Sequence, residues 1–352
     1  MILLVVPAAE ILDLAGPVQV FHEAGLLGAP YELLSCATTP RVRTNQGLWL
    51  CDLAPLPPDP AGDDLIVVPG LHLSALAQIE PAVLAWLRAA HAAGVPIASV
   101  CTGAFVLGAA GLLDGRQCTT HWSLLTKLQE AFPATRVLAN RLYVTDGPIT
   151  TSAGIASGID MALALVEARH GPRTAAATAH EMVVYMRRDG MHRQHSVYLD
   201  YRTHLHPGVH RVQDWLVAHA AERSSLDDLA RLAAMSPRHL TRVFRQATGI
   251  SIRDYSLRLR LELAGVLLHE PHLTIEAVAE RCGFASARQL RRQWRDTFGT
   301  TPSQTRGQSS VPKAPQTAAR DESTADGGGD LPVADLAGVA LIDEARRGFG
   351  GE

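Results

Sequence analysis

Short apolar runs alternate with stretches of helical periodicity over the first 170 residues. Runs rich in Val, Ile and Leu predict strands at 2–6, 31–37, 64–70, 96–100, 141–147 and 148–154. Apolar residues at intervals of three or four predict helices at 14–25, 80–93, 102–111, 121–131, 155–170 and 172–187. Strands that are apolar throughout are covered on both faces. The pattern therefore predicts an α/β domain with a doubly wound parallel sheet.

From residue 208 onward the periodicity is helical only, and one unit occurs twice. The two copies read SPRHLTRVFRQATG (236–249) and SARQLRRQWRDTFG (286–299), 50 residues apart. Short amphipathic segments, 226–234 and 275–283, precede them. Two short helices of which the second is rich in arginine describe a helix-turn-helix, so two of them predict a chain that binds neighbouring grooves of DNA. The helix predicted at 252–268 would then hold both units at the ~34 Å interval of adjacent major grooves.

The phase of the apolar positions divides each arginine-rich helix into two faces. In the first copy Leu240, Val243, Phe244 and Ala247 recur at helical spacing and are predicted to face the core. Arg and Gln suit guanine and adenine edges in the major groove, and residues in the first two turns reach those edges. The predicted base-contacting arginines are Arg238, Arg242, Arg288 and Arg292, with His239 and Gln289 on the same faces. Arg245 and Arg295 are assigned to phosphates or to pairs within the domain.

An arginine-rich solvated face in an all-helical dimerisation domain would also give one such helix. Two copies in the same phase, each with Ser at its start and Gly at its end, favour DNA binding over that alternative. The charge agrees. Residues 208–306 carry 15 Arg and 10 Asp plus Glu, a balance of +5, whereas 1–207 and 307–352 each have a balance of −4, which together give the net charge of −3.

Two segments lack a regular pattern. Residues 188–207 collect Arg, His and Tyr and are interpreted as a linker. His192, His195, His204 and His206 in that segment raise the possibility of a metal site, but no fixed face organises them, so a solvated linker is favoured. Residues 307–352 have the composition of a disordered tail. Within the tail, 331–347 is compatible with an isolated helix or with a contact to a partner.

The strand at 96–100 leads directly into Cys101 and a predicted helix, within ASVCTGAFVLGAAGLLDGR (98–116). A residue at such a turn is exposed above the sheet edge beside the positive helix N-terminus, which predicts a lowered thiol pKa. The N–H groups of Thr102 and of the turn that ends at Gly70 are expected to form an anion cradle. Asp13, in the loop after the first strand, and His121 are the expected polar partners. Ligands of open α/β sheets bind at this edge.

The C-terminal half resembles AraC/XylS-type DNA-binding domains. The signature lies at 283–306, with Gly283, Phe284, Ser286, Phe298, Gly299, Pro302 and Arg306 in place. Leu290 and Thr305 stand where that family usually has aromatic residues, and both are packing positions by the pattern. The resemblance implies promoter DNA and RNA polymerase as partners, and activation more often than repression.

Residues 1–187 resemble the ThiJ/PfpI superfamily, whose fold is flavodoxin-like and similar to amidotransferases. The match is closest to the sensor domains of GlxA-like regulators, through 12–21, 67–70, VCTGAF around Cys101, 120–122 and 149–166. Enzymes of the superfamily often carry His directly after the nucleophile, where this chain has Thr102. Some hydratases of the superfamily instead have Cys followed by Thr and an early Asp, as here. Cys101 is therefore open to three interpretations: a structural turn residue, a ligand-contacting or redox-sensitive thiol, or a catalytic nucleophile partnered by Asp13.

Asp160 is expected to pair within the start of its own helix.

These patterns predict four regions: a ligand-sensing domain (1–187), a linker (188–207), a double helix-turn-helix domain (208–306) and a tail (307–352). We expect a cytoplasmic transcription regulator, because no apolar run approaches the ~20 residues that span a bilayer and five cysteines have no disulfide spacing. The resemblance implies a homodimer and a small effector, nitrogen-containing or amino-acid-derived in some relatives. No cofactor or metal is expected. The alternatives are a thiol-dependent hydratase or hydrolase that uses Cys101, and a redox-sensing regulator.

Overall fold

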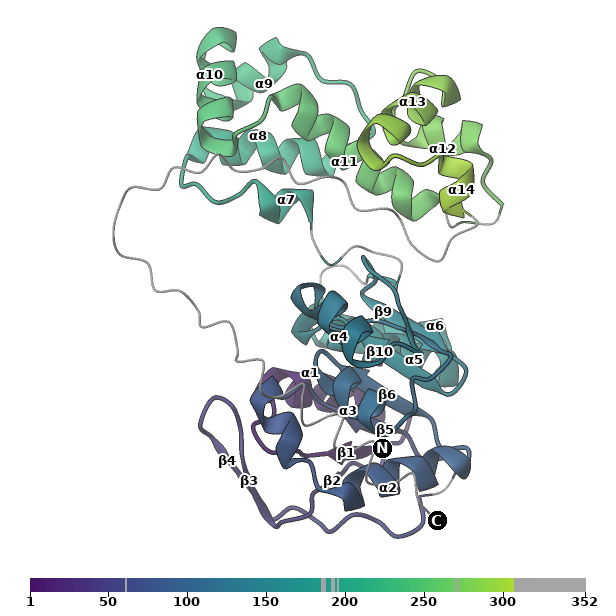
Figure 1. Cartoon of the computed structure of the whole chain (residues 1–352). Helices are drawn as coiled ribbons and strands as arrows, with labels where there is room; N and C mark the ends of the chain where they lie inside the picture. Colours follow the sequence, from purple (N-terminus) through teal and green to yellow (C-terminus); the bar gives the residue numbers. More distant parts are fainter. Residues whose placement is uncertain are drawn as a thin grey trace. The chain divides into compact units, whose positions relative to one another are not determined.

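The computed structural model describes residues 1–306 apart from 61, 185–187, 191–193, 195, 269 and 271 (Figure 1). The predicted tail, with its apolar segment 331–347, lies outside the described residues. The chain divides into two compact units, of which the first ends at Gln194. Each unit has its own core, and no helix among the described residues is both long and apolar enough to cross a membrane.

A six-stranded sheet forms the centre of the first unit. In the order of the sheet, the strands are β2 (Leu34–Cys36), β1 (Ile2–Leu4), β5 (Ile66–Val68), β6 (Ile97–Val100), β10 (Ile149–Ser152) and β9 (Tyr143–Asp146). All neighbours are parallel except β9, which pairs with β10 as an antiparallel edge strand. The two strands predicted around residue 148 therefore form a hairpin, and the predicted doubly wound parallel sheet is confirmed with one antiparallel strand at its edge.

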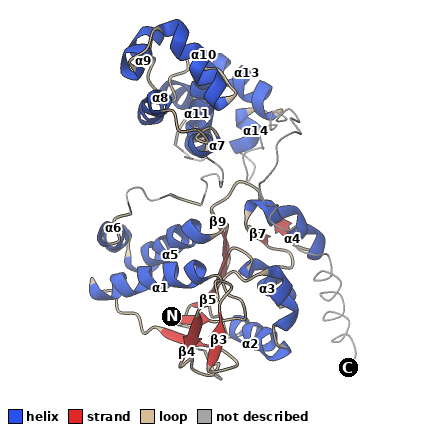
Figure 2. Cartoon of the chain, turned by 90° about the vertical axis from the view of Figure 1, so that its left-hand side faces the viewer, coloured by secondary structure: helices blue, strands red, loops and turns tan. Residues whose placement is uncertain are grey.

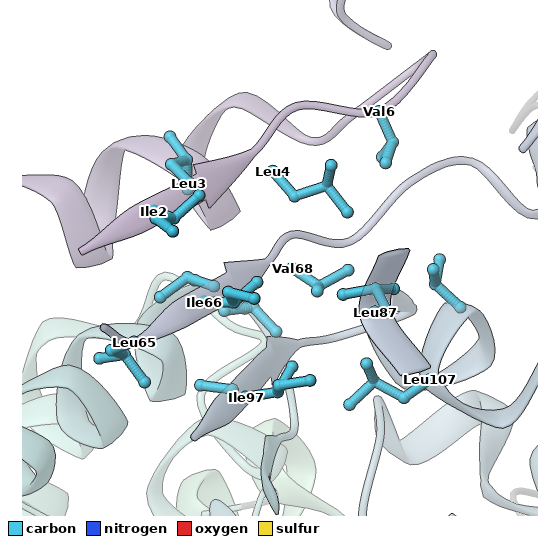
Figure 3. Close-up of a cluster of buried hydrophobic side chains, with 14 of the residues drawn as sticks. Ile2, Leu3, Leu4, Val6, Leu65, Ile66, Val68, Leu87, Ile97 and Leu107 are labelled. Atoms are coloured by element: carbon cyan, nitrogen blue, oxygen red, sulfur yellow. The ribbon is translucent and has the colours of Figure 1, made fainter. Parts of the chain in front are cut away.

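Helices cover both faces of the sheet, as the unbroken apolar strands predict. Figure 2 shows α1 (Ile11–Leu26), α5 (Ile155–His170) and α6 (Pro172–Glu181) on one face, with α2 (Pro81–Ala92) and α3 (Gly103–Ala109) on the other. Figure 3 shows side chains of β1, β5 and β6 meeting Leu87 of α2 and Leu107 of α3. Both leucines are fully buried. Burial of each such side chain contributes roughly 1.5–3 kcal/mol to folding.

Several short elements lie outside this framework. They are the hairpin β3 (Arg41–Arg43) and β4 (Trp49–Cys51), the pair β7 (Gln117–Cys118) and β8 (Arg136–Val137), the 3₁₀ turns η1 (Leu73–Gln78) and η2 (Trp122–Leu124), and α4 (Leu125–Ala131). The pattern predicted a helix at 121–131 but none of the four short strands, because two or three residues are too few for a periodic signal. The helix predicted at 172–187 ends at Glu181, and Val183 adopts a φ of 53° that cannot continue it.

The second unit consists of two helix-turn-helix bundles joined by a long helix. The first contains α8 (Pro207–Ala218), α9 (Leu226–Ala233) and α10 (Pro237–Thr248), and the second contains α12 (Ile275–Arg281), α13 (Ala287–Phe298) and α14 (Pro302–Arg306). Figure 1 shows α11 (Ile252–Leu267) running from one group to the other. Tyr255 and Leu259 of this helix enter the first core, while Leu261 and Ala264 enter the second. The spacer predicted between the bundles is thus confirmed.

The repeat in the sequence has the same local structure in both copies. Ser236 and Ser286 cap α10 and α13 by accepting a hydrogen bond from the backbone N–H three residues on. Gly249 and Gly299 end these helices with φ of 77° and 70°, a conformation that glycine adopts without steric cost. The capping signals explain why both copies begin and end at equivalent residues.

The two departures from the AraC/XylS pattern are packed into the second core. Leu290 and Thr305 are fully buried. The indole Nε1–H of Trp294 donates to the Thr305 hydroxyl at 3.2 Å, so a polar residue at this buried position has a partner. The substitution replaces aromatic packing with a hydrogen bond inside the bundle.

The predicted linker 188–207 divides between the two units. Arg188 and Gln194 belong to the first unit, and the short helix α7 (Val197–Asp200) belongs to the second, where Val197 joins the first bundle's core. The interpretation of the whole segment as a solvated linker is therefore wrong. Its residues carry no periodicity because single side chains, rather than a helical face, anchor it.

Candidate functional site

The turn between β6 and α3 positions Cys101 at the carboxyl edge of the sheet. Cys101 has a φ of 53°, a left-handed conformation that is uncommon for a residue with a side chain. Gly103 makes the turn possible, because a Cβ there would come within 2.5 Å of the Val68 carbonyl oxygen. The predicted strand-to-helix turn is present, and its backbone strain is typical of functional sites.

Asp13, Cys101 and Thr102 converge on Gly70. A Cβ at Gly70 would lie 2.2 Å from Asp13 Oδ2 and 3.0 Å from the Cys101 Cβ, so only glycine fits. The Gly70 N–H donates to Asp13 Oδ2 at 3.1 Å. The Thr102 hydroxyl bonds the backbone N–H and carbonyl of Leu71, each at 2.7 Å. Asp13 sits in the first turn of α1 rather than in a loop, which corrects our prediction of its place.

These contacts also correct the predicted anion cradle. The Gly70 N–H that we expected to face an anion is already bonded to the Asp13 carboxyl group. Asp13 is fully buried, and its Oδ1 has no hydrogen-bond partner among the described residues. This edge of the sheet therefore presents an acceptor, or a carboxylic acid, where we expected a set of donors.

The prediction of a lowered thiol pKa at Cys101 is wrong. Burial, followed by the negative charges of Asp13 and Glu10, raises its pKa to about 12, and these effects outweigh the Thr102 N–H and hydroxyl. Burial and the neighbouring charge of Glu10 likewise raise the pKa of Asp13 to about 7. The thiol is therefore protonated at neutral pH, and the Asp13 carboxyl group titrates within the physiological range of pH.

A pocket of about 570 Å³ opens beside these residues. His121 lines it, and its Nδ1 is 2.8 Å from the Ser123 hydroxyl. His121 and Cys101 flank Gly154, where a Cβ would lie 3.5 Å from His121 Cδ2 and 3.9 Å from the Cys101 sulfur. The structure thus brings Asp13, Cys101, Thr102 and His121 to one pocket. The apolar part of its wall comprises Leu71, Leu73, Trp122, Leu124, Leu142, Ala153, Ile155 and Ala156.

Two polar residues of the pocket were missed by the sequence analysis. Arg188 and Gln194 line the pocket, and both fall in the segment interpreted as a linker. Arg188 forms an ion pair with Asp160 of α5, with N···O distances of 3.0 and 2.6 Å. Asp160 therefore pairs across to Arg188 and not within the start of its own helix, as we expected. No sequence signal marks either residue, because both are placed by tertiary contacts.

Gln194 is held at the pocket by three hydrogen bonds. Its Nε2 donates to the carbonyls of Thr120 and Arg141 at 3.0 and 2.9 Å, and to the Thr119 hydroxyl at 3.3 Å. The Thr120 hydroxyl in turn donates to the Cys101 carbonyl at 2.8 Å. The chain that leaves the first unit is therefore tied to the same turn that carries Cys101.

The arginine-rich faces lie on α10 and α13. Arg238, His239, Arg242 and Arg245 are exposed on α10, where Arg242 contacts His239 Nδ1 at 3.1 Å and Gln246 Oε1 at 3.3 Å. Together with Thr241, the three arginines and Gln246 line a shallow groove. Leu240, Val243 and Phe244 are buried on the other face of α10. The spacing of the apolar residues in the sequence predicts this division of the helix into an exposed and a buried face.

On α13 the arginines and the glutamine differ in exposure. Arg288, Arg292 and Arg295 are exposed. Gln289 is half-buried; its side-chain oxygen accepts a hydrogen bond from the Ala285 N–H at 2.8 Å, and its own N–H donates to the Ser286 hydroxyl at 3.2 Å. Gln289 thus helps to begin the helix, whereas the arginines project from it.

The histidines that raised a metal site do not form one among the described residues. His192 and His195 lie outside those residues. His206 caps α8, and His204 packs against His210. No group of three or more His, Cys, Asp or Glu side chains suited to a metal occurs in the described part of the chain.

Family models match both units of the chain. The DJ-1/PfpI family matches residues 1–168, and a helix-turn-helix domain matches residues 229–308. The HTH-type transcriptional regulator CdhR of Pseudomonas aeruginosa is 31% identical over 309 residues, which cover 86% of this chain and 90% of that protein. The chain belongs to this family of HTH-type transcriptional regulators. The predicted union of a ThiJ/PfpI-type domain with an AraC-type DNA-binding domain is confirmed.

Two further relatives show what each part of the regulator resembles. The HTH-type transcriptional regulator GlxA of Rhizobium meliloti is 32% identical over 223 residues, 63% of this chain and 68% of that protein. An isonitrile hydratase of Pseudomonas putida is 36% identical over 175 residues, 49% of this chain and 72% of that enzyme. The regulator is thus a DNA-binding transcription regulator whose first unit shares its family with enzymes.

Proposed function

We propose that a small-molecule effector binds in the pocket beside Cys101 and controls the binding of promoter DNA by α10 and α13. The observation that carries this proposal is Asp13, a residue that lines the pocket and whose buried Oδ1 has no hydrogen-bond partner among the described residues. A buried acceptor without a partner costs about 1–3 kcal/mol. A ligand that donates a hydrogen bond to it would recover that cost.

The lining of the pocket limits the chemistry of the effector. Asp13 and Glu10 favour a ligand with an N–H or O–H donor, while His121 and Arg188 provide donors of their own. The apolar remainder of the wall accommodates a short carbon skeleton. A nitrogen-containing or amino-acid-derived metabolite, as the family resemblance implies, meets these requirements. We assign Asp13, Cys101 and His121 to ligand contact, and Gly70 and Thr102 to holding the turn.

Binding rather than turnover is the role we propose for Cys101. A thiol with a pKa of about 12 is almost wholly protonated at pH 7, which disfavours both nucleophilic attack and oxidation by peroxide. The similarity to an isonitrile hydratase keeps a hydratase as the second candidate function. Turnover of an isonitrile that disappears in Cys101→Ala would establish that alternative, and a peroxide response lost in Cys101→Ser would establish the redox one.

On the DNA side we propose that Arg238, Arg242, Arg288 and Arg292 contact base edges. All four are exposed on the first two turns of their helices, where side chains reach the floor of the major groove. Arg245 and Arg295 lie further along and are assigned to phosphates. His239 is assigned to the same surface as Arg242, and Gln289 to a base contact that competes with its capping bond to Ala285.

The route between pocket and DNA is the segment that contains Gln194 and α7. Gln194 lines the pocket, and Val197, three residues later, packs in the core of the first bundle, where its N–H bonds Glu262 of α11. A ligand that displaces Gln194 would therefore change the strain on a chain only three residues from the DNA-binding unit. We further propose a homodimer that recruits RNA polymerase as an activator, as the resemblance implies.

The test uses the full chain and a DNA fragment from the region upstream of its own gene. The proposal predicts nanomolar binding at moderate salt that weakens at least tenfold in Arg242→Ala and in Arg292→Ala. Arg231→Ala is the matched control, because this exposed arginine of α9 pairs with Asp228 and is not on either arginine-rich face. Equal losses in the control and in the two variants would contradict the assignment of α10 and α13.

A further inference from the structure

A second cavity, of about 600 Å³, lies in the DNA-binding unit between its two bundles. One wall includes Thr241 of α10, and the other includes Gln289 and Gln293 of α13. Thr241 also lines the arginine groove of α10, so this central cleft adjoins that groove. The cleft lies between the two elements proposed to enter neighbouring major grooves.

The cleft has a positive lining without a compensating acid. Arg223, Arg253 and Arg260 line it, and none of its lining residues is Asp or Glu. Arg223 and Arg253 are exposed, and among the described residues no ion pair joins either of them to a carboxylate. The N-termini of α9 and α11 reach the cleft through Leu226 and Ile252, and a helix N-terminus adds partial positive charge.

Two acidic residues near the cleft, in the first turns of α9 and α11, bond other partners. Asp228 in the first turn of α9 bonds the Ser225 hydroxyl and Arg231, and Asp254 in the first turn of α11 bonds the Ser251 hydroxyl at 2.7 Å. Neither carboxylate lines the cleft. The local field of the cleft is therefore set by arginines and backbone N–H groups, which together suit an anion.

Arg260 has a different role from the other two arginines. Its guanidinium donates to the carbonyls of Ala220, Glu222 and Gly283, at 3.0, 2.7 and 3.4 Å. Gly283 has a φ of 70°, and a Cβ there would lie 2.0 Å from the Ala221 carbonyl oxygen. The segment before α9 and the turn after α12 are thus in direct backbone contact, which fixes the width of the cleft.

We propose that this cleft binds the sugar–phosphate backbone that separates the two major grooves entered by α10 and α13, with Arg223 and Arg253 as the phosphate contacts. Adjacent major-groove faces are ~34 Å apart, and the strand between them crosses the space between the two helices. The proposal rests on α10 and α13 facing DNA. It adds a contact that fixes register on the duplex and carries no base information itself.

The experiment measures the affinity of the full chain for its upstream DNA fragment as a function of salt. Each phosphate contact contributes roughly 0.9 to the slope of log K against log salt, so Arg223→Ala with Arg253→Ala reduces the slope by about 1.8. Discrimination between this fragment and a scrambled one stays unchanged, because bases are not contacted. The double substitution to Lys retains the slope, since the charge remains.

Two controls make the outcome specific. Arg231→Ala removes an exposed arginine outside the cleft and leaves the slope unchanged. Arg242→Ala with Arg292→Ala lowers discrimination, which tests the proposed function separately from the cleft. A normal slope in the Arg223→Ala, Arg253→Ala variant, with its thermal unfolding unchanged, overturns the cleft proposal alone. An equal slope reduction in Arg231→Ala overturns it as well, because the effect would then be one of general surface charge.

Discussion

At the scale of single residues, the first unit is organised around an acid that is costly to ionise. Asp13 is fully buried, accepts one hydrogen bond from Gly70 and leaves Oδ1 unpaired. Its carboxylate charge also raises the pKa of the Cys101 thiol. A pocket built in this way holds a reactive-looking cysteine in its protonated form while presenting an acidic hydrogen-bonding group to a ligand. On this ground we propose that the site binds a ligand and does not use Cys101 as a thiolate nucleophile.

Asp13 makes the stability of the first unit depend on pH. Its pKa rises from an ordinary 3.8 to about 7 in the folded chain, so the stabilisation from its protonated form is fully present below pH 3.8 and is lost as pH rises to about 7. Asp13→Asn keeps an acceptor for Gly70 and cannot ionise. We expect the variant to match the parent near pH 4 and to exceed it by about 2–4 kcal/mol at pH 8.

Calorimetric unfolding of the full chain at a series of pH values measures this difference through the transition of the first unit. A stability difference that stays constant from pH 4 to pH 8 would show that Asp13 ionises normally. The sign matters as much as the size, because an acid stabilised by a positive partner would give the opposite trend.

At the scale of elements, the sequence predicts helices and strands best where they repeat a pattern. The caps at Ser236 and Ser286 and the glycines that end α10 and α13 predict both arginine-rich helices to within a residue. The four short strands β3, β4, β7 and β8 escape prediction because pairing, and not periodicity, defines them. Arg188 and Gln194 escape for a related reason: isolated long-range contacts place them at the pocket.

The contact between the two bundles gives a prediction at this scale. Gly283→Ala forces a Cβ against the Ala221 carbonyl and also disfavours a φ of 70°. We expect the second unit to lose about 3 kcal/mol or more, from roughly 1–2 for the left-handed conformation and a further 1–3 for the overlap. Thermal unfolding of the full chain is the measurement.

Gly249→Ala is the matched control. This glycine has a φ of 77° at the end of α10, and nothing lies within 4 Å of its would-be Cβ. The control should lose only the roughly 1–2 kcal/mol of the left-handed conformation. Equal losses at both positions would mean that the bundles are not held in contact at Gly283.

At the scale of the whole molecule, the family relationship makes the chain a DNA-binding transcription regulator, and the pocket supplies its proposed input. Both halves were recognisable from sequence because their motifs are local: the turn at Cys101 and the repeated helices. The connection between the two halves was not recognisable from sequence, since the segment 188–207 was interpreted as a solvated linker. Within this segment, Gln194 is hydrogen-bonded to the first unit, and Val197 packs in a core of the second.

That connection predicts a variant in which sensing and DNA binding are separated. Gln194→Ala removes three hydrogen bonds at the pocket and leaves α10 and α13 untouched. We expect its DNA affinity without effector to stay within about threefold of the parent, and the change of affinity on adding an effector to fall by at least fivefold. Gln129→Ala is the control, because this glutamine bonds Thr135 and Val137 away from the pocket. Loss of DNA binding itself in Gln194→Ala would contradict the proposed route.

Occupation of the pocket beside Cys101 is proposed to change the affinity of the regulator for DNA. The most direct measurement is the affinity of the full chain for its upstream fragment, with and without an amino-acid derivative selected from a panel because it raises the thermal stability of the first unit. We predict a change of 5- to 150-fold, corresponding to about 1–3 kcal/mol of coupling, which disappears in Ala156→Trp, where the new side chain fills the pocket. Equal DNA affinities with the pocket empty and saturated would contradict it.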